Sequence, residues 1–286
     1  MPQSLRRLTL CAAAALSALA PAVHAADWSD TYMGYRYGTK FAEPFNPNDI
    51  TKNILNLNHA SGYKYGSNFF NVDLLLSDEK DPAGAGSTNG ATEVYIVYRN
   101  TLDFAKVSGK PMNMGFVRSW GLTAGFDANA KTDAGYNSKK RMLVLGPTMM
   151  VDVPGFLNIS LVALWESNAP YNTFTKVSTP RYRYDTHGAI FAAWGIPLGQ
   201  DTGFSFEGFA NFIASKGKNE FGGDTAPETN IDMQVMYDIG RLWGTKGMKL
   251  GFEYQYWKNK FGNDADGPAG DGAFAKTPMV RFQYHF

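Results

Sequence analysis

Apolar and polar residues alternate over many short segments of this chain. The C-terminal segment TPMVRFQYHF places Val280, Phe282, Tyr284 and Phe286 at every second position, with polar or charged residues between them. A period of two predicts an extended strand with one apolar and one polar face. The same alternation recurs in NFFNVDLLLSD, GFSFEGFANF, NIDMQVMYDIG and MKLGFEYQYW. No long window keeps a helical period, so the pattern predicts an all-β protein.

About twelve segments have the composition of strands. They lie near residues 31–39, 52–60, 67–77, 92–101, 114–126, 141–152, 156–167, 182–195, 203–214, 229–240, 247–257 and 277–286. Long polar connections, such as TKFAEPFNPNDIT, follow the odd-numbered strands, and short turns follow most even-numbered ones, with the longish NTLDFAKVSGKPMN as an exception. This layout predicts a transmembrane, antiparallel, up-and-down β-barrel with short periplasmic turns and long extracellular loops.

Closure of such a barrel explains why the chain ends on an ordered strand. Every backbone polar group in lipid must be paired, so we expect the last strand to pair with the first, around DTYMGYRYG. A secreted soluble β-sandwich would also alternate. The barrel is favoured because the polar face carries many charges and because aromatic residues gather near strand ends, as in interfacial belts. These aromatic residues are Tyr95, Tyr98, Trp120, Trp165, Trp194 and Trp257.

The first 25 residues have the pattern of a secretory signal peptide. Arg6 and Arg7 precede an apolar stretch, and Val23 and Ala25 supply small residues for cleavage after Ala25. Residues 26–286 are then expected to form a single barrel domain. Cys11 is the one cysteine in the sequence and lies in this leader, so disulfides and cysteine metal sites are excluded from the mature chain. Removing two arginines from 27 basic residues leaves 25 against 26 acidic ones, which gives no electrostatic footprint for nucleic acid.

If the apolar rows face lipid, the polar rows line the lumen. We therefore expect a mostly acidic lumen with a few cations, either a network of ion pairs that stiffens the barrel or a polar pore for a small solute. The candidate lining residues on the strands are Asn71, Asp73, Glu93, Arg99, Glu207, Asn211, Asp232, Glu253 and Arg281.

The predicted loop FAEPFNPNDI is unusually apolar for a long connection. Pro44 and Pro47 stiffen it, and Phe41 and Phe45 are too apolar to lie freely in water. Two interpretations stay open. The loop packs against its neighbours, or it folds into the pore mouth, where an aromatic face could stack on a planar solute.

The segment NHASG offers the one arrangement that suggests an enzyme. His59 and Ser61 lie two apart on a strand and share a face, as a base and nucleophile of a lipid hydrolase could. This pair falls at the periplasmic end, whereas an enzyme for outer-leaflet lipid needs the opposite end. The sequence contains none of the usual metal, calcium, phosphate-loop or GxSxG motifs, so no cofactor or metal is expected. We predict that the protein is not an enzyme.

Several segments together resemble the Tsx-like nucleoside-specific channel family of outer-membrane proteins. They are YKYGSNFFNVDLLLSD, YDTHGAIFAAWGIPLG with GFSFEGFANFIASKG, FEYQYWKNKFG and the terminal FQYHF. The resemblance implies a narrow, monomeric, 12-stranded barrel that passes nucleosides across the outer membrane, with no cofactor. It also implies partners: membrane lipid and lipopolysaccharide, the barrel-assembly machinery through Phe286, and phages or colicins that use such barrels as receptors.

The function predicted from the sequence is a channel for small solutes, with nucleosides preferred. A general small-solute porin, a receptor barrel with a blocked lumen and, less favoured, an outer-membrane lipid hydrolase remain as alternatives.

Overall fold

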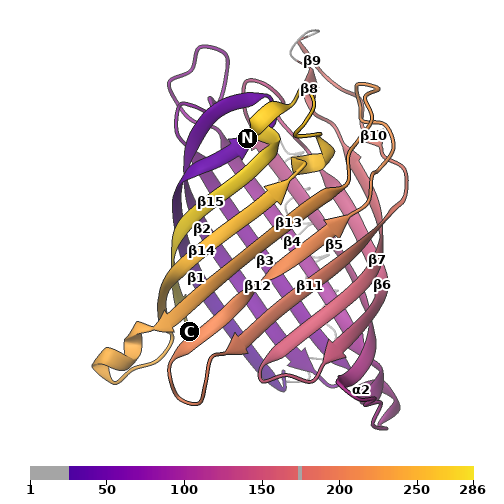
Figure 1. Cartoon of the computed structure of the whole chain (residues 1–286), viewed down its shortest axis with the longest axis vertical. Helices are drawn as coiled ribbons and strands as arrows, with labels where there is room; N and C mark the ends of the chain where they lie inside the picture. Colours follow the sequence, from indigo (N-terminus) through magenta and orange to yellow (C-terminus); the bar gives the residue numbers. More distant parts are fainter. Residues whose placement is uncertain (1–25, 173–175) are drawn as a thin grey trace, which may run out of the picture.

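The computed structural model describes residues 26–172 and 176–286 (Figure 1). The predicted signal peptide, residues 1–25, lies outside the described residues, so its cleavage stays a prediction.

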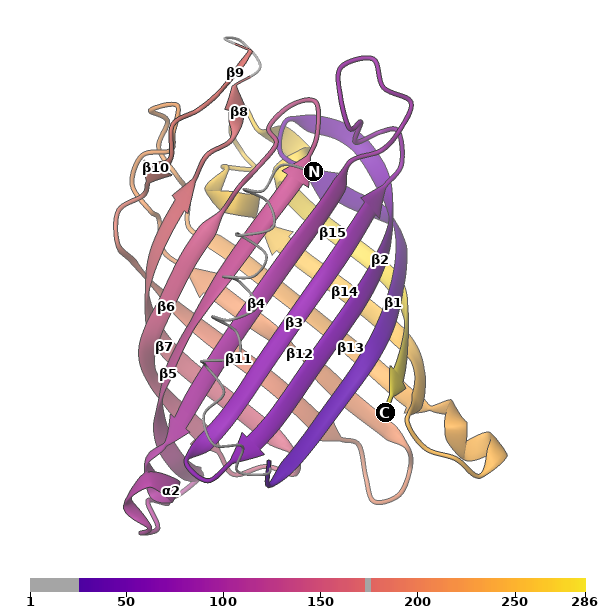
Figure 2. The ribbon, with the colours of Figure 1, turned by 180° about the vertical axis from the view of Figure 1, so that it is seen from behind.

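Twelve long strands form one antiparallel sheet that closes on itself (Figures 1 and 2). Each strand pairs with its neighbour along the chain, and the last strand pairs with the first from Tyr32 opposite His285 to Tyr37 opposite Val280. The predicted up-and-down barrel and its closure are therefore confirmed, and the sandwich is excluded. The barrel strands are β1 (Trp28–Glu43), β2 (Asn46–Tyr63), β3 (Gly66–Ser77), β4 (Thr92–Asp103), β5 (Val117–Thr132), β6 (Arg141–Val151), β7 (Phe156–Asn168), β11 (His187–Pro197), β12 (Phe204–Ile213), β13 (Glu228–Asp238), β14 (Met248–Lys258) and β15 (Phe274–His285).

The remaining elements are short and lie in the connections. In the long loops are β8 (Tyr171–Asn172), β9 (Val177–Ser178), β10 (Tyr182–Arg183) and the 3-10 turns η2 (Lys260–Gly262) and η3 (Gly270–Ala273). At the short-turn end are the helix α2 (Phe104–Ser108) and the 3-10 turn η1 (Ile239–Trp243). Across the two described ranges, no helix is both long enough and apolar enough to cross a membrane.

The first extracellular connection corrects the sequence prediction. Residues 40–51 are predicted as a loop, but β1 runs to Glu43 and β2 begins at Asn46, which leaves a two-residue hairpin turn of Pro44 and Phe45. Register shifts follow Gly38 and Phe41, and such bulges bend a hairpin. The hairpin accordingly curves over the upper end of the barrel (Figures 1 and 2). Its apolar side chains extend the strand pattern, which is why the segment is sheet.

The outer wall of the barrel is apolar. Outward positions on β6, β7 and β14 carry Leu143, Leu161 and Phe252, and Phe252 is 77% exposed. In water such a surface would be unfavourable, whereas in a bilayer it matches the acyl chains. The inner wall carries the polar rows and two small apolar clusters, one of Met142, Val144, Val162, Leu164 and Ala189, the other of Phe41, Ile50, Ile54 and Met279. The molecule is therefore a transmembrane barrel with a polar lumen.

Candidate functional site

A network of opposite charges lies on the lumen wall where the barrel closes. Arg36 on β1 binds Asp73 on β3, with 2.5 Å between Nη2 and Oδ2. Glu253 on β14 binds Arg36 through Oε1 at 3.2 Å and Arg281 through Oε2 at 2.8 Å. Arg281 also donates to the Tyr32 hydroxyl at 2.8 Å. This cluster, called here the seam network, gathers both charge signs in one region of the lumen wall, with the Glu253 carboxylate buried between the two guanidinium groups.

A second network lies under the bent β1–β2 hairpin. Glu43 accepts hydrogen bonds from Lys52 at 2.6 Å and Lys260 at 3.2 Å, and its Oε1 is 3.5 Å from Nζ of Lys131. Lys131 also binds Asp81 at 2.9 Å. Lys131 is on β5, four strands from β1, so Glu43 ties the hairpin to the facing wall. These five residues, the mouth network, narrow the extracellular opening.

The opposite side of the lumen combines ion pairs with an apolar surface. Arg99 on β4 binds Asp127 on β5, with 2.5 Å between Nη1 and Oδ1. The Arg99 guanidinium carbon also lies 5.7 Å from the ring centre of Phe191 on β11, within the range of a cation–π contact. Phe191 and Ile213 pack on the apolar cluster around Val162. The lumen is thus amphipathic, since charged groups lie beside an aromatic, apolar surface formed by Phe191 and the cluster around Val162.

A third polar group, on the periplasmic side of the lumen, centres on Glu207 of β12. Its carboxylate accepts from Lys249 at 2.7 Å, Ser205 at 2.7 Å and Gln234 at 3.0 Å. Every oxygen of Glu207 is therefore engaged, and Lys249 balances its charge. An ion that entered from this end would meet a neutral pair and not a free carboxylate.

The extracellular loops hold a further cluster above the barrel. Glu220 accepts from the hydroxyls of Tyr136 and Tyr184, the second at 2.6 Å, and Asn168 donates to Tyr136 at 2.9 Å. Burial, reinforced by the Glu220 carboxylate, raises the pKa of Tyr136 well above its ordinary value. Tyr136 therefore stays a hydrogen-bond donor that holds the β12–β13 loop against the β5–β6 loop.

The strand residues predicted for the lumen occupy lumen-facing rows. Asp73, Glu253 and Arg281 meet in the seam network, while Arg99 and Glu207 form the pairs described above. The other four have neutral partners or places in the register. Asn71 accepts from Asn56 at 2.7 Å, Glu93 accepts from Asn129 at 2.6 Å, Asp232 accepts from Gln255 at 3.4 Å, and Asn211 lies opposite Phe191.

The two phenylalanines of the predicted loop lie in different places. Phe41 is buried in the inner apolar cluster, with the Lys52 ammonium 5.6 Å from its ring centre. Phe45 lies at the tip of the hairpin and its side chain is 69% exposed. Phe41 thus follows the interpretation in which the segment packs on its neighbours, and neither ring is brought to the seam network.

Sequence reasoning missed several lumen groups. Lys52 and Lys131 were overlooked because both lay at or beyond predicted strand ends. Phe191 was overlooked because the segment HGAIFAAWGIP is apolar on both faces and gives no alternation. Lys216, which binds Glu166 at 2.7 Å, lies in the loop after β12, where side chains do not alternate between lipid and lumen.

The suggested hydrolase pair is not assembled. Nδ1 of His59 lies 2.7 Å from the hydroxyl of Thr31, its cross-strand neighbour. His59 and Ser61 share an outward row with the exposed Leu55 and Leu57, so they face the lipid side of β2. Within residues 26–172 and 176–286, no three His, Cys, Asp or Glu side chains are grouped as a metal site.

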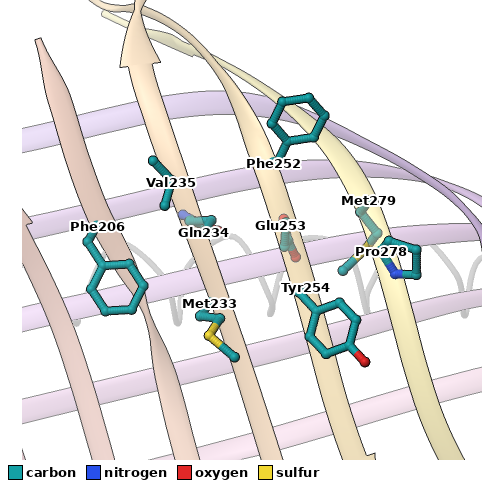
Figure 3. A pocket seen from close by; sticks show the side chains of 9 residues that line it. All are labelled: Phe206, Met233, Gln234, Val235, Phe252, Glu253, Tyr254, Pro278 and Met279. Atoms are coloured by element: carbon teal, nitrogen blue, oxygen red, sulfur yellow. The ribbon is translucent and has the colours of Figure 1, made fainter.

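A shallow depression of about 340 Å³ lies on the outer wall across β12–β15 (Figure 3). Its lining includes the outward side chains of Phe206, Met233, Phe252 and Tyr254. Gln234, Glu253 and Met279 also line it but belong to the alternate, lumen-facing rows. Because this depression opens toward the acyl chains, it is separate from a solute path through the barrel.

Comparisons with known proteins give structural similarity only. No family model matches the chain, and no curated protein matches it. Among solved structures, it is similar to the KdgM porin at 9% identity and a TM-score of 0.41, covering 89% of this chain and 99% of that one. It is also similar to the translocator domain of the autotransporter NalP from Neisseria meningitidis at 12% identity and a TM-score of 0.47, covering 99% and 98%. Because these TM-scores are below 0.5, the barrel assignment rests on the strand pairings themselves.

Proposed function

We propose that this chain is an outer-membrane channel for the passive passage of small solutes, with nucleosides as the preferred class. The observation that carries the proposal is the amphipathic lumen, in which Phe191 and its apolar cluster face the charged seam network. A general pore needs only water and a constriction, whereas an aromatic surface opposite charged groups favours a solute with one flat apolar face and one polar edge.

A nucleoside has this chemistry. Its base can stack on an aromatic ring such as Phe191, and stacking of a base on an aromatic side chain is worth about 1–3 kcal/mol. Its ribose hydroxyls can donate to carboxylates such as Asp73 and accept from the guanidinium of Arg36. Asp127 and Arg99 lie beside the ring and can bind the base edge. The solute needs no net charge, because the lumen charges are paired with each other.

The export and location of the protein are part of the proposal. Residues 1–25 would direct the chain to the periplasm, residues 26–286 would form a monomeric barrel in the outer membrane, and Phe286 would be read by the barrel-assembly machinery. Phospholipid and lipopolysaccharide would surround the outer wall, and the extracellular loops would be available to phages or colicins.

The deciding experiment is single-channel conductance of refolded residues 26–286 in a planar bilayer, titrated with adenosine, thymidine and, as a control, glucose. We expect a small conductance that both nucleosides block and glucose leaves unchanged. Conductance that is indifferent to all three solutes would reject the nucleoside preference and leave a general pore.

A receptor barrel with a blocked lumen is the second candidate, and the mouth network favours it. Glu43, Lys52, Lys131 and Lys260 come from different elements and meet under the bent hairpin, which narrows the entrance. Absence of conductance in the same bilayer, with the folded protein verified by its gel mobility, would support this alternative over the channel.

A further inference from the structure

Two connections at the periplasmic end expose large apolar side chains. In the β4–β5 connection, which contains α2, the exposed residues are Phe104, Val107, Met114 and Phe116, the last at 67%. In the β13–β14 connection, which contains η1, Leu242 and Trp243 are each 66% exposed. Soluble surfaces rarely gather such residues without a partner, so these two segments point to an apolar neighbour.

Their local structure holds these side chains outward. Asp103 caps α2 by accepting from the backbone N–H of Ala105 at 3.0 Å, and it also accepts from the Ser119 hydroxyl. Asp238 caps η1 by accepting from the N–H of Gly240 at 3.1 Å. Since the caps fix both turns, the exposed apolar residues belong to ordered segments and not to frayed loops.

The two segments project from opposite sides of the barrel's lower end, where Figures 1 and 2 show α2 on one side and the orange β13–β14 connection on the other. Each continues a lipid-facing aromatic surface. Trp120 is exposed on the outer row of β5 beside the α2 connection, and Tyr237 packs on Phe204, 4.7 Å between ring centres, beside the η1 connection. The apolar side chains therefore extend the aromatic belt of the barrel outward and not into the lumen.

The charge of these segments is of one sign. Residues 104–118 carry Lys106, Lys110 and Arg118 and no acidic residue, and residues 239–248 carry Arg241 and Lys246 and no acidic residue. Lysine and arginine that flank buried aromatic side chains are typical of segments that lie at the headgroup level of a bilayer. Such cations attract anionic phospholipid.

We propose that these two connections are membrane anchors that insert Phe104, Val107, Phe116, Leu242 and Trp243 into the phospholipid leaflet at the periplasmic end. Lys110, Arg118 and Lys246 meet the phosphate groups, whereas Lys106 is paired with Asp27 at 3.2 Å and Arg241 donates to the backbone carbonyl of Asp201. A protein partner would bury one continuous patch, whereas these residues lie on opposite sides of the rim and adjoin the lipid-facing wall on both. This anchoring is independent of the solute that passes through the lumen.

The test uses site-directed spin labels on refolded residues 26–286, which contain no native cysteine. Leu242→Cys and Phe116→Cys are labelled in vesicles of phosphatidylcholine with phosphatidylglycerol, and collision rates with oxygen and with a water-soluble nickel chelate are compared. Gln200→Cys, exposed on the β11–β12 turn at the same end, is the matched control. We expect several-fold higher oxygen than nickel accessibility at positions 242 and 116, and the reverse at 200.

Labels at 242 and 116 that match the nickel accessibility of 200 would overturn the anchor. The charge component is tested with the variant Lys246→Ser carrying the label at 242. We expect its label to become more accessible to nickel than in the parent, and this difference should shrink when phosphatidylglycerol is omitted from the vesicles. A charge variant whose label keeps the parent accessibility in both lipids would reject the role of the cations.

Discussion

Arg36 and Arg281 lie directly opposite each other in the register of β1 and β15, and both guanidinium groups bind the carboxylate of Glu253. Like charges that face each other across two strands destabilise a sheet. These two lie at the seam where the barrel closes, so Glu253 and Asp73 convert a repulsive pair into a network that joins β14, β15, β1 and β3.

We expect Glu253→Gln to destabilise the barrel, because the substitution removes the carboxylate that both facing arginines bind. Removal of one partner from a buried ion pair costs about 3–5 kcal/mol, and a loss of about 3 kcal/mol is expected here. Urea unfolding of the refolded barrel in vesicles measures the change. The double variant Glu253→Gln, Arg281→Gln should recover part of the loss, since it removes the repulsion. A double variant as unstable as the sum of the single variants would contradict this account.

Nucleoside binding is expected to depend on Phe191. Phe191→Ala removes the ring beside Arg99 and should weaken the block by adenosine about tenfold, the order expected for loss of one base-stacking contact. Single-channel titration measures the block. Phe206→Ala, on the lipid-facing wall, is the matched control and should leave the block unchanged. Equal effects of the two substitutions would indicate a change in the barrel and not in a solute site.

The barrel could be predicted because each strand residue faces either lipid or the lumen. A strand in this position must alternate apolar and polar residues, and segments such as NIDMQVMYDIG show this alternation. The prediction failed where the environment stops alternating. Residues 40–51 leave the lipid but continue as sheet, because Phe41 and Ile50 pack inside the mouth with Ile54 and Met279.

The alternation predicts which strand residues face the lumen but not which of them contact one another. The alternation places Asp73, Glu253 and Arg281 on lumen-facing rows. It could not show that Arg36 binds Asp73 and Glu253, because contacts between side chains of different strands depend on how the strands are staggered around the closed sheet. Lys131 meets Glu43 across four strands, a relationship that no sequence spacing encodes. Phe191 was missed since a strand that is apolar on both faces hides its inward residue.

The mouth network is expected to hold the β1–β2 hairpin over the entrance. Glu43→Gln weakens its contacts with Lys52, Lys131 and Lys260 and should increase both the mean conductance and the open-channel noise, because the hairpin is tied less firmly. Bilayer recordings measure both quantities. Asp49→Asn, on the same hairpin, is the control, since its side chain is exposed and Lys80 binds its backbone carbonyl, which the substitution keeps. Conductance and noise unchanged from wild type would show that the network does not gate the channel.

Substitution of Phe286 is expected to affect assembly in cells but not the stability of the folded barrel. The Phe286 ring is 69% exposed on the outer wall, while its backbone N–H donates to the carbonyl of Thr31 at 2.9 Å. Phe286→Ala keeps this hydrogen bond and loses only a mostly exposed ring that stacks on Tyr284, 6.3 Å between ring centres, so the refolded barrel should keep its urea midpoint within the error of the measurement. In cells the same variant should insert poorly, because we propose that the assembly machinery recognises this ring.

The control is Phe252→Ala, also exposed on the outer wall, which should insert normally. Heat-modifiable gel mobility of outer-membrane fractions measures the folded amount, and normal insertion of Phe286→Ala would show that the ring is not the signal.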